Sequence, residues 1–415
     1  MKLELGFGTG TQTVEISDAN LMEVLMPNHM EFTSTGEAEV LRALQNPIGS
    51  KRLREIVRPH EKIAIITSDI TRPMPTAKVM PALMEELDAA GVSDSDVTVV
   101  FGLGSHRHQT ESEMRHLVGD VAFERYRCVD SDPSDCVCLG YTKNGTPVDI
   151  TSAVASAQRR ICLGNIEYHY FAGYSGGGKA IMPGVSTRKA IQQNHCQMVK
   201  QEAHAGKLEG NPVREDIEEA AALCGIDFLL NVVLDEHKQI VKAVAGHWVE
   251  AHREGCRFLD QLYLKPIKQP ADIVLVSQGG APKDLNLYQT QKALDNAKHA
   301  VKKGGVIVLV GSCKEGLGEK TFEQWMTQSE SPRSMVERIA RDFQLGGHKA
   351  AAIAQVLENA EIDLVSEMKP SFVKSIFLKP YDTVQAALDA AFEKLGKNAT
   401  VIAMPYGGST LPRVQ

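Results

Sequence analysis

The 415-residue sequence lacks a long apolar run and an excess of basic residues. The opening residues contain no long apolar run after the first lysine, so we expect neither a signal peptide nor a transit peptide. No stretch approaches the roughly 20 apolar residues that span a bilayer. Basic residues are not in excess, and a net charge of −7 disfavours nucleic acid and anionic membranes as partners. These absences predict a protein that remains in the cytoplasm and does not bind nucleic acid.

Cysteine is present, but without the spacing of a zinc ribbon or a disulfide framework. The eight cysteines are scattered, and none of them forms a CxxC pair. Cys136 and Cys138 form a CxC pair that would face one side of an extended chain and could share a metal. Two small buried thiols are the commoner arrangement. An HExxH zinc motif is also absent.

The composition, 43% hydrophobic and 23% charged, is typical of a globular protein, and the length favours two domains. Apolar runs of strand length recur, bounded by glycine or polar residues, as in parallel strands buried on both faces. They lie at residues 62–67, 97–102, 160–165, 272–277, 305–311 and 400–404.

Helical patterns lie between these runs. Residues 80–90 have apolar positions at helical spacing, and Thr110 with Glu113 fits a capping box. Asn211 and Pro212 fit the N-cap and first position of a helix that ends at Gly225. Alternating strands and helices predict an α/β fold with mainly parallel sheets flanked by helices.

The segment 265–270 (KPIKQP) interrupts this alternation just before a new strand and is the predicted linker. It divides the chain into an N-terminal α/β domain, residues 1–265, and a C-terminal α/β domain, residues 270–415. The last residues could pack back on the first domain. We expect the active site in the cleft between the two.

Polar segments follow several predicted strands, and ligands of open parallel sheets bind beyond the carboxyl ends of the strands. Residues 69–72, 105–108 and 278–282 follow three of the runs, and His169 follows a fourth. Arg72 is suited to bind a substrate carboxylate. The alternative is a surface arginine paired with Asp69.

Residues 173–180 (GYSGGGKA) almost match a phosphate-binding P-loop. Ala180 lacks the hydroxyl that binds Mg²⁺, and Pro183 stops the long helix that such a loop requires. Consecutive glycines can form an anion-binding nest or a plain turn. Lys179, desolvated at the end of such a nest, would have a lowered pKa and could act as a nucleophile.

Three of the thirteen histidines lie near these segments: His106, His169 and His195. Imidazole exchanges protons near neutral pH and is the commonest metal ligand, so either use is open. Most of the others, His252 and His348 among them, are predicted to be surface or capping residues.

Together these residues make the sequence resemble the nickel-pincer-dependent lactate racemase family. The resemblance is carried by DITRPMP (69–75), by GSHR (104–107) and by the long block HYFAGYSGGGKAIMPGV with a following NH, from 169 to 195. A weaker block covers residues 277–294. It implies that Lys179 carries a nickel-pincer nucleotide (pyridinium-3-thioamide-5-thiocarboxylic acid mononucleotide) through a thioamide bond, and that His195 binds its Ni(II). The residues implied to contact this cofactor further are Asp69, Ser175, Gly176, Gly177 and Gly178.

The resemblance also implies a reaction, in which an isomerase inverts the Cα centre of a 2-hydroxy acid such as lactate or malate. Separate cofactor-synthesis proteins would supply its cofactor. His106 and His169 would be the paired acid and base, while the cofactor accepts and returns a hydride. The implied substrate-binding residues are Arg72, Lys292, Tyr288 and Gln289. The choice among 2-hydroxy acids stays open.

Two other functions remain open from the residues alone. One is a zinc-dependent hydrolase or lyase that uses His106, His169 and His195 as ligands. The other is a phosphate or nucleotide sensor built on the glycine-rich loop, which leaves those histidines without a role.

Overall fold

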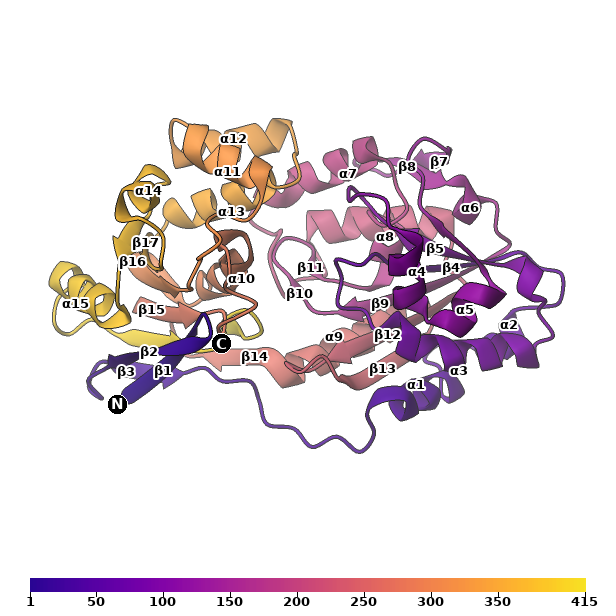
Figure 1. The fold of residues 1–415 in the computed structure, drawn as a ribbon, viewed down its shortest axis with the longest axis horizontal. Helices are drawn as coiled ribbons and strands as arrows, with labels where there is room; N and C mark the ends of the chain where they lie inside the picture. Colours follow the sequence, from indigo (N-terminus) through magenta and orange to yellow (C-terminus); the bar gives the residue numbers. More distant parts are fainter. The chain divides into compact units, whose positions relative to one another are not determined.

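The computed structural model describes all 415 residues and divides into two compact units (Figure 1). The central unit comprises residues 30–261, and the terminal unit joins residues 1–29 to residues 262–415. The predicted division at 265–270 lies close to one boundary. However, the first 29 residues group with the C-terminal part and not with the domain predicted for residues 1–265.

The central unit is built on a six-stranded sheet in the order β13-β12-β9-β4-β5-β6. All neighbours are parallel except β12 and β13. The strands are β4 (Ile63–Ser68), β5 (Val97–Gly102), β6 (Arg127–Asp130), β9 (Arg159–Ile166), β12 (Phe228–Leu234) and β13 (Ile240–Gly246). Two hairpins accompany them, β7 (Cys136–Tyr141) with β8 (Pro147–Thr151), and β10 (Tyr168–His169) with β11 (Gly173–Tyr174).

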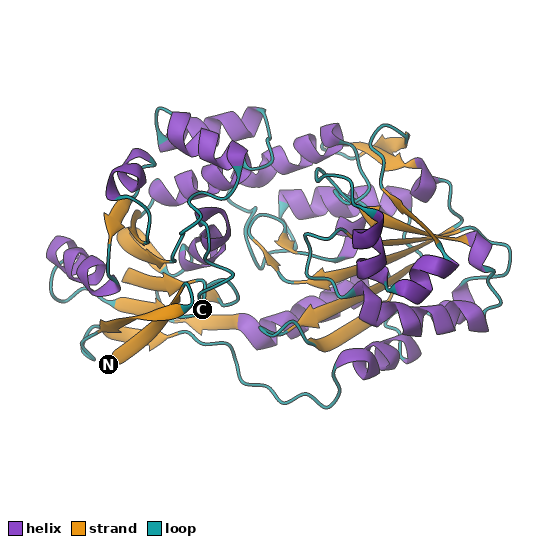
Figure 2. Cartoon of the chain, viewed as in Figure 1, coloured by secondary structure: helices purple, strands orange, loops and turns teal.

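Helices flank this sheet, as Figure 2 shows. The α-helices are α1 (Gly36–Gln45), α2 (Leu53–Ile56), α3 (Thr76–Ala89), α4 (Glu111–Val118), α5 (Asp120–Arg125), α6 (Ser152–Ala155), α7 (Arg188–His195), α8 (Pro212–Cys224) and α9 (Trp248–Tyr263). Three short 3₁₀ turns are η1 (Asp94–Asp96), η2 (Gly177–Ala180) and η3 (Cys196–Val199).

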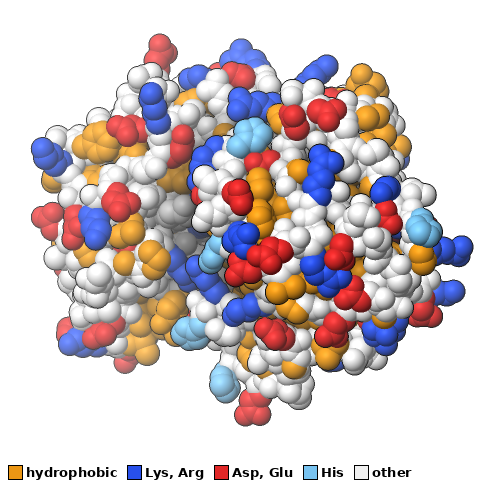
Figure 3. All heavy atoms as spheres, turned by 45° about the vertical axis from the view of Figure 1, so that its right-hand side comes forward, with side chains coloured by type: hydrophobic (Ala, Val, Ile, Leu, Met, Phe, Trp, Pro, Cys, Tyr) orange, Lys and Arg blue, Asp and Glu red, His pale blue; other side chains and the backbone are white.

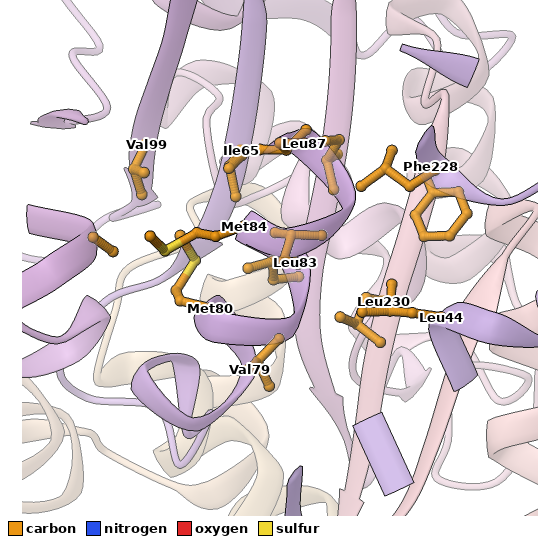
Figure 4. Packing of buried hydrophobic residues seen from close by; sticks show 14 of the residues in the cluster. Leu44, Ile65, Val79, Met80, Leu83, Met84, Leu87, Val99, Phe228 and Leu230 are labelled. Atoms are coloured by element: carbon orange, nitrogen blue, oxygen red, sulfur yellow. The ribbon is translucent and has the colours of Figure 1, made fainter. Parts of the chain in front are cut away.

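The core of the central unit lies between α3 and the sheet (Figure 4). Leu83 and Leu87 of α3 are fully buried in one cluster with Ile65 of β4 and Val99 of β5. Each such side chain contributes about 1.5–3 kcal/mol by leaving water. This packing fixes the strands whose ends carry the polar segments.

The terminal unit has a six-stranded, fully parallel sheet in the order β18-β17-β16-β15-β19-β3. Its strands are β3 (Leu21–Val24), β15 (Ala271–Ser277), β16 (Val301–Val310), β17 (Glu361–Val365), β18 (Lys379–Tyr381) and β19 (Val401–Met404). Its helices are α10 (Leu287–Ala297), α11 (Lys320–Gln328), α12 (Pro332–Arg341), α13 (Gly347–Leu357), α14 (Pro370–Ser375) and α15 (Val384–Leu395).

Pairing explains why the first residues belong to this unit. Strand β3 adds to the edge of the sheet beside β19. The preceding hairpin, β1 (Lys2–Phe7) and β2 (Gly10–Glu15), buries Leu5 and Val14 in the same core as Ile273. An edge strand of four residues is too short to be recognised in the sequence.

The predicted linker is partly wrong. Strand β14 (Leu264–Ile267) occupies its first half and pairs in parallel with β20 (Leu411–Val414), near the end of the chain. Pro266 is tolerated there because a two-stranded sheet leaves each strand with an open edge.

Several local predictions are confirmed. The Thr110 hydroxyl accepts from the Glu113 amide in a capping box, and Asn211 caps α8 with Pro212 in its first turn. All eight cysteines are free. None of the helices combines the length and apolar character needed to cross a membrane. Charges of both signs are intermixed over the face seen in Figure 3.

Candidate active site

Three of the four polar segments follow adjacent strands of the central sheet. β4 lies between β9 and β5, and all three run parallel, so their carboxyl ends meet at one edge. Asp69 follows β4, His106 comes shortly after β5, and His169 follows β9. Residues 278–282 follow β15 and belong to the terminal unit.

Asp69 and His106 form a hydrogen-bonded pair. The Oδ2 atom of buried Asp69 lies 2.5 Å from Nδ1 of His106, and Oδ1 accepts from the hydroxyl and amide of Thr71. Burial opposes ionisation of Asp69, but the bonds from His106 and Thr71 outweigh it and hold the pKa of Asp69 below its ordinary value. The ionised carboxylate can only accept, so Nδ1 of His106 carries the proton and Nε2 carries the lone pair.

His169 has the opposite arrangement. Its Nδ1 accepts from the Ala172 amide at 3.3 Å, so the neutral ring carries its proton on Nε2. Burial lowers the pKa of His169 well below its ordinary value, and the positive charges of Lys179 and Arg72 lower it further. Tyr168 and Tyr174 donate to Asp260 of α9 at 2.8 Å, which fixes the hairpin that carries His169.

Buried Phe171 connects three of the predicted residues. Its ring makes edge contacts with His169 and His195, at centroid distances of 4.5 and 4.9 Å. The Nζ atom of Lys179 lies 5.8 Å from the same ring centroid. His169, Lys179 and His195 therefore surround one aromatic ring.

The glycines before Lys179 are explained by packing against the protein. A Cβ on Gly176 would lie 2.5 Å from Oδ1 of Asn231, one on Gly177 would lie 2.9 Å from the His252 ring, and one on Gly178 would lie 2.9 Å from Ala221. Gly176 and Gly177 also have positive φ angles.

The polar groups of this loop are engaged in the same way. The Gly177 amide donates to Asn231, and the Ser175 hydroxyl donates to the carbonyl of Asn165 and accepts from the Glu167 amide. These contacts give no support to an anion nest. The contact of Ser175 and of residues 176–178 with a cofactor stays a prediction.

Lys179 is partly buried, and its amine makes no hydrogen bond or ion pair. Burial lowers its pKa well below the ordinary value, and the charges of Arg214 and Arg72 act in the same direction, opposed by Glu167. A neutral amine without an acceptor is suited to form a covalent bond to a carbonyl or thiocarbonyl carbon.

A hydrogen-bond chain fixes the tautomer of buried His195. Nδ2 of Asn194 donates to the Asp216 carboxylate at 2.8 Å and to the Val213 carbonyl at 3.1 Å, both of which can only accept. Oδ1 of Asn194 therefore faces Nδ1 of His195, at 2.7 Å, and Nδ1 must donate. The lone pair of the neutral ring is on Nε2, as a metal ligand requires. The tautomer of His195 and the neutral amine of Lys179 fit the implied cofactor.

The structure does not bring together three or more His, Cys, Asp or Glu side chains that could hold a metal. A zinc site made of His106, His169 and His195, or one that includes the CxC pair, therefore has no support in the fold. Arg72 is exposed and forms no ion pair with Asp69, contrary to the surface-pair alternative.

The other predicted substrate residues, Tyr288, Gln289 and Lys292, lie on α10 of the terminal unit. Asn286 caps this helix, and Lys349 of α13 donates to the Tyr288 carbonyl while its Nζ lies 3.9 Å from the Tyr288 ring centroid. Their role with the residues of the central unit stays a prediction.

Sequence reasoning missed four residues at this site, namely Phe171, Asn194, Arg214 and His252. Predicting His252 as a surface or capping residue was wrong, because it is buried and donates from Nε2 to the Ser175 carbonyl at 2.8 Å. The same prediction for His348 holds in part: the side chain is buried, but its Nδ1 accepts from the amide of Gly346, the N-cap residue of α13, at 3.0 Å. Position within the block from 169 to 195 could have indicated Phe171 and Asn194, whereas nothing local marks Arg214.

The chain is similar to known proteins over nearly its whole length. The family model described as the lactate racemase N-terminal domain matches residues 7–206, and the lactate racemase C-terminal domain matches residues 267–411. The chain is 33% identical over 423 residues to the lactate racemase of Thermoanaerobacterium thermosaccharolyticum, with 99% of each covered. It is 30% identical over 417 residues to that of Lactiplantibacillus plantarum, with 98% of each covered.

Solved structures give the same result. The structure of the lactate racemase apoprotein from T. thermosaccharolyticum superposes with a TM-score of 0.90 at 32% identity and covers 100% of both chains. A Thermotoga maritima protein matches with a TM-score of 0.65 at 16% identity over 93% of this chain and 100% of that chain, which shows the fold alone. The chain belongs to the lactate racemase family and is an isomerase of the racemase type.

Proposed function

We propose that the protein inverts the Cα centre of a 2-hydroxy acid, lactate or a related acid such as malate, with a nickel-pincer nucleotide attached to Lys179. The observation that carries this proposal is the arrangement around Phe171, where an amine without a partner lies beside two histidines. Family membership supports the reaction class.

Lys179 would hold the nucleotide covalently, and Nε2 of His195 would be the protein ligand to nickel. When bound, the group supplies a reversible acceptor for the Cα hydride. Asp69 is a weaker candidate for cofactor contact, because Thr71 and His106 take both of its oxygens. We propose instead that Asp69 positions His106.

The two acid/base histidines have complementary tautomers. Nε2 of His106 carries a lone pair and can take the hydroxyl proton of one enantiomer, since the Asp69 carboxylate stabilises the resulting imidazolium. Nε2 of His169 would return a proton to the oxygen of the planar 2-keto acid while the hydride returns to its opposite face. It would do so from the imidazolium form, since loss of a proton from the neutral ring would leave an imidazolate. Inversion in the other direction reverses these roles.

Arg72 would hold the substrate carboxylate, since its guanidinium is exposed beside this strand end and has no ion-pair partner. Lys292, Tyr288 and Gln289 would complete substrate binding. A carboxylate held throughout the reaction keeps the planar intermediate from leaving before the hydride returns.

The test is intact-mass and metal analysis of protein made in a host that synthesises the cofactor, followed by a chiral assay. We expect an adduct on the Lys179 peptide, bound nickel, and inversion of lactate, malate or another 2-hydroxy acid. The Lys179→Arg variant should lack both adduct and turnover. Unmodified Lys179 and no inversion of any tested acid, in a host proven to load a known lactate racemase, would overturn the proposal.

A further inference from the structure

The segment that joins His169 to the lysine loop is held by an unusual row of contacts. Five consecutive carbonyls, of residues 171–175, each accept a hydrogen bond from outside the segment. The donors are Asn211 Nδ2 to Phe171 at 2.9 Å, Arg214 Nε to Ala172 at 3.0 Å, the Gly206 amide to Gly173 at 3.0 Å, Arg214 Nη2 to Tyr174 and His252 Nε2 to Ser175 at 2.8 Å.

Arg214 is the one side chain in this row that supplies two of the bonds. It lies on α8, directly after the cap made by Asn211, and it is completely buried. Its third nitrogen, Nη1, has no hydrogen-bond partner and lies 4.0 Å from the carboxylate of Glu218. A buried guanidinium so incompletely paired is costly, which favours a role for its charge.

The charge of Arg214 acts on Lys179. Four charged or titratable groups face this amine: Arg214 on α8, Arg72 after β4, Glu167 after β9, and His169. Arg214 is the strongest of the charges that disfavour the ammonium form, and Glu167 alone favours it. Arg253 of α9 and Glu218 of α8 form an ion pair with each other, and neither changes the pKa of Lys179 directly.

We propose that Arg214 is a positioning residue for the anchor lysine. From α8 it fixes the backbone between His169 and the lysine loop, and so places the amine for attack on an acyl or thioacyl carbon. This role rests on the proposed function of Lys179 as a covalent anchor, yet it is a property of the polypeptide before any cofactor is attached.

The test uses the full-length protein without cofactor and acetyl phosphate as the probe. The Lys179 amine attacks the acetyl carbon, the N–C bond forms as the C–O bond to phosphate breaks, and the amine proton passes to buffer. Acetylation of the Lys179 peptide is followed by mass spectrometry from pH 6 to 10, with exposed Lys189 and Lys200 as internal references. We expect Lys179 to reach half-maximal acetylation at lower pH than both references.

Arg214→Gln should raise the pH of half-maximal acetylation by about one unit and slow the reaction at pH 7 about tenfold. The matched control is Arg160→Gln, since Arg160 also holds two carbonyls, those of Val154 and Ala155, through Nε and Nη2. This control should leave the profile of Lys179 unchanged.

Two further variants separate charge from contact and keep the test decisive if Arg214→Gln does not fold. Arg214→Lys keeps the charge and should retain the low midpoint. Arg214→Leu removes the charge together with both hydrogen bonds and should raise the midpoint as Arg214→Gln does. A wild-type midpoint equal to the references would overturn the role of Arg214. So would a wild-type midpoint in Arg214→Gln or Arg214→Leu, whichever of the two folds. Failure of the proposed function would show itself separately, as absence of adduct and turnover in protein made with the cofactor.

Discussion

The two strand ends that supply the proposed acid and base differ in nearly every electrostatic respect. After β4 and β5, Asp69 accepts from His106, and a carboxylate faces the imidazole. After β9, the pKa of half-buried His169 is lowered by burial and, among the charges, most by Lys179 and Arg72. One histidine is held by an anion at Nδ1, and the other by a backbone amide at the same atom.

The proposed racemisation would therefore use two histidines with unlike surroundings in nearly mirrored roles. The partner of Nδ1 decides which tautomer is present, and therefore whether Nε2 begins as acceptor or as donor. The lowered pKa of His169 makes its imidazolium a stronger acid than that of an ordinary histidine, which favours return of a proton to the substrate oxygen. Substitutions at each of the two strand ends test this difference between His106 and His169.

The largest expected effect comes from the histidines themselves. His106→Asn or His169→Asn should each lower turnover about 10²–10⁴-fold, since each removes one proton-transfer group, while the Lys179 adduct remains. Chiral assay and intact mass on the same preparation measure both quantities. His116→Asn, at an exposed position on α4, is the control. Equal turnover in the wild type and either site variant would exclude that histidine from the reaction.

Next in size is the carboxylate at the first strand end. Asp69→Asn should lower turnover about 10–100-fold, less than loss of His106, because orientation is lost but the imidazole stays. The pKa of Asp69 is depressed in the folded state, so its contribution to stability is present above the ordinary aspartate pKa and disappears as pH falls through the folded value. The free energy of unfolding, measured from pH 7 to pH 3, should therefore decrease less steeply in the variant than in the wild type.

His195, the proposed nickel ligand, offers a third comparison. Asn194→Leu removes the acceptor that holds Nδ1 of His195 and should reduce nickel retention about 10–100-fold, with the Lys179 adduct unchanged. Metal analysis after dialysis against a chelator measures this loss. Full retention of nickel would mean that the hydrogen bond from His195 does not govern its tautomer.

The smallest effect is expected at Asp363 of β17. Like Asp69 it is a buried carboxyl, but its Oδ1 has no hydrogen-bond partner. Burial, with Glu361 nearby, raises the pKa of Asp363 to about 7. A raised carboxyl pKa makes stability decline as pH rises from about 4 to 7. Asp363→Asn should thus raise the free energy of unfolding by about 1–3 kcal/mol at pH 8 and leave it unchanged below pH 4. Asp389→Asn, exposed on α15, should change neither value.

Much of the fold could be predicted because its information is local. Continuous apolar runs located three strands of each sheet, β4, β5 and β9 in one and β15, β16 and β19 in the other, while the remaining strands were not predicted. Caps at Thr110 and Asn211 located two helix starts. The edge strands β3 and β14 escaped, because a four-residue strand has too little pattern and its partner lies far along the chain.

The site divides in the same way. Chemically conspicuous residues such as Lys179, His169 and His195 could be named from their block, and the structure gathers them around Phe171. Arg214 and His252 could not, since a polar residue in a helix looks solvent-facing until the loop that covers it is known. The glycines were noticed for their conformational freedom, but the side chains of Asn231, His252 and Ala221 that pack against them could not be recognised in the sequence.

The lysine loop has a consequence for the order of folding. Its glycines fit only against β12, α8 and α9, which lie about 40 to 75 residues further along the chain. Contacts over such separations form late, after the local elements are in place. A chain that has not completed its central sheet therefore lacks the lysine loop in its final form, and the proposed cofactor attachment would select correctly folded molecules.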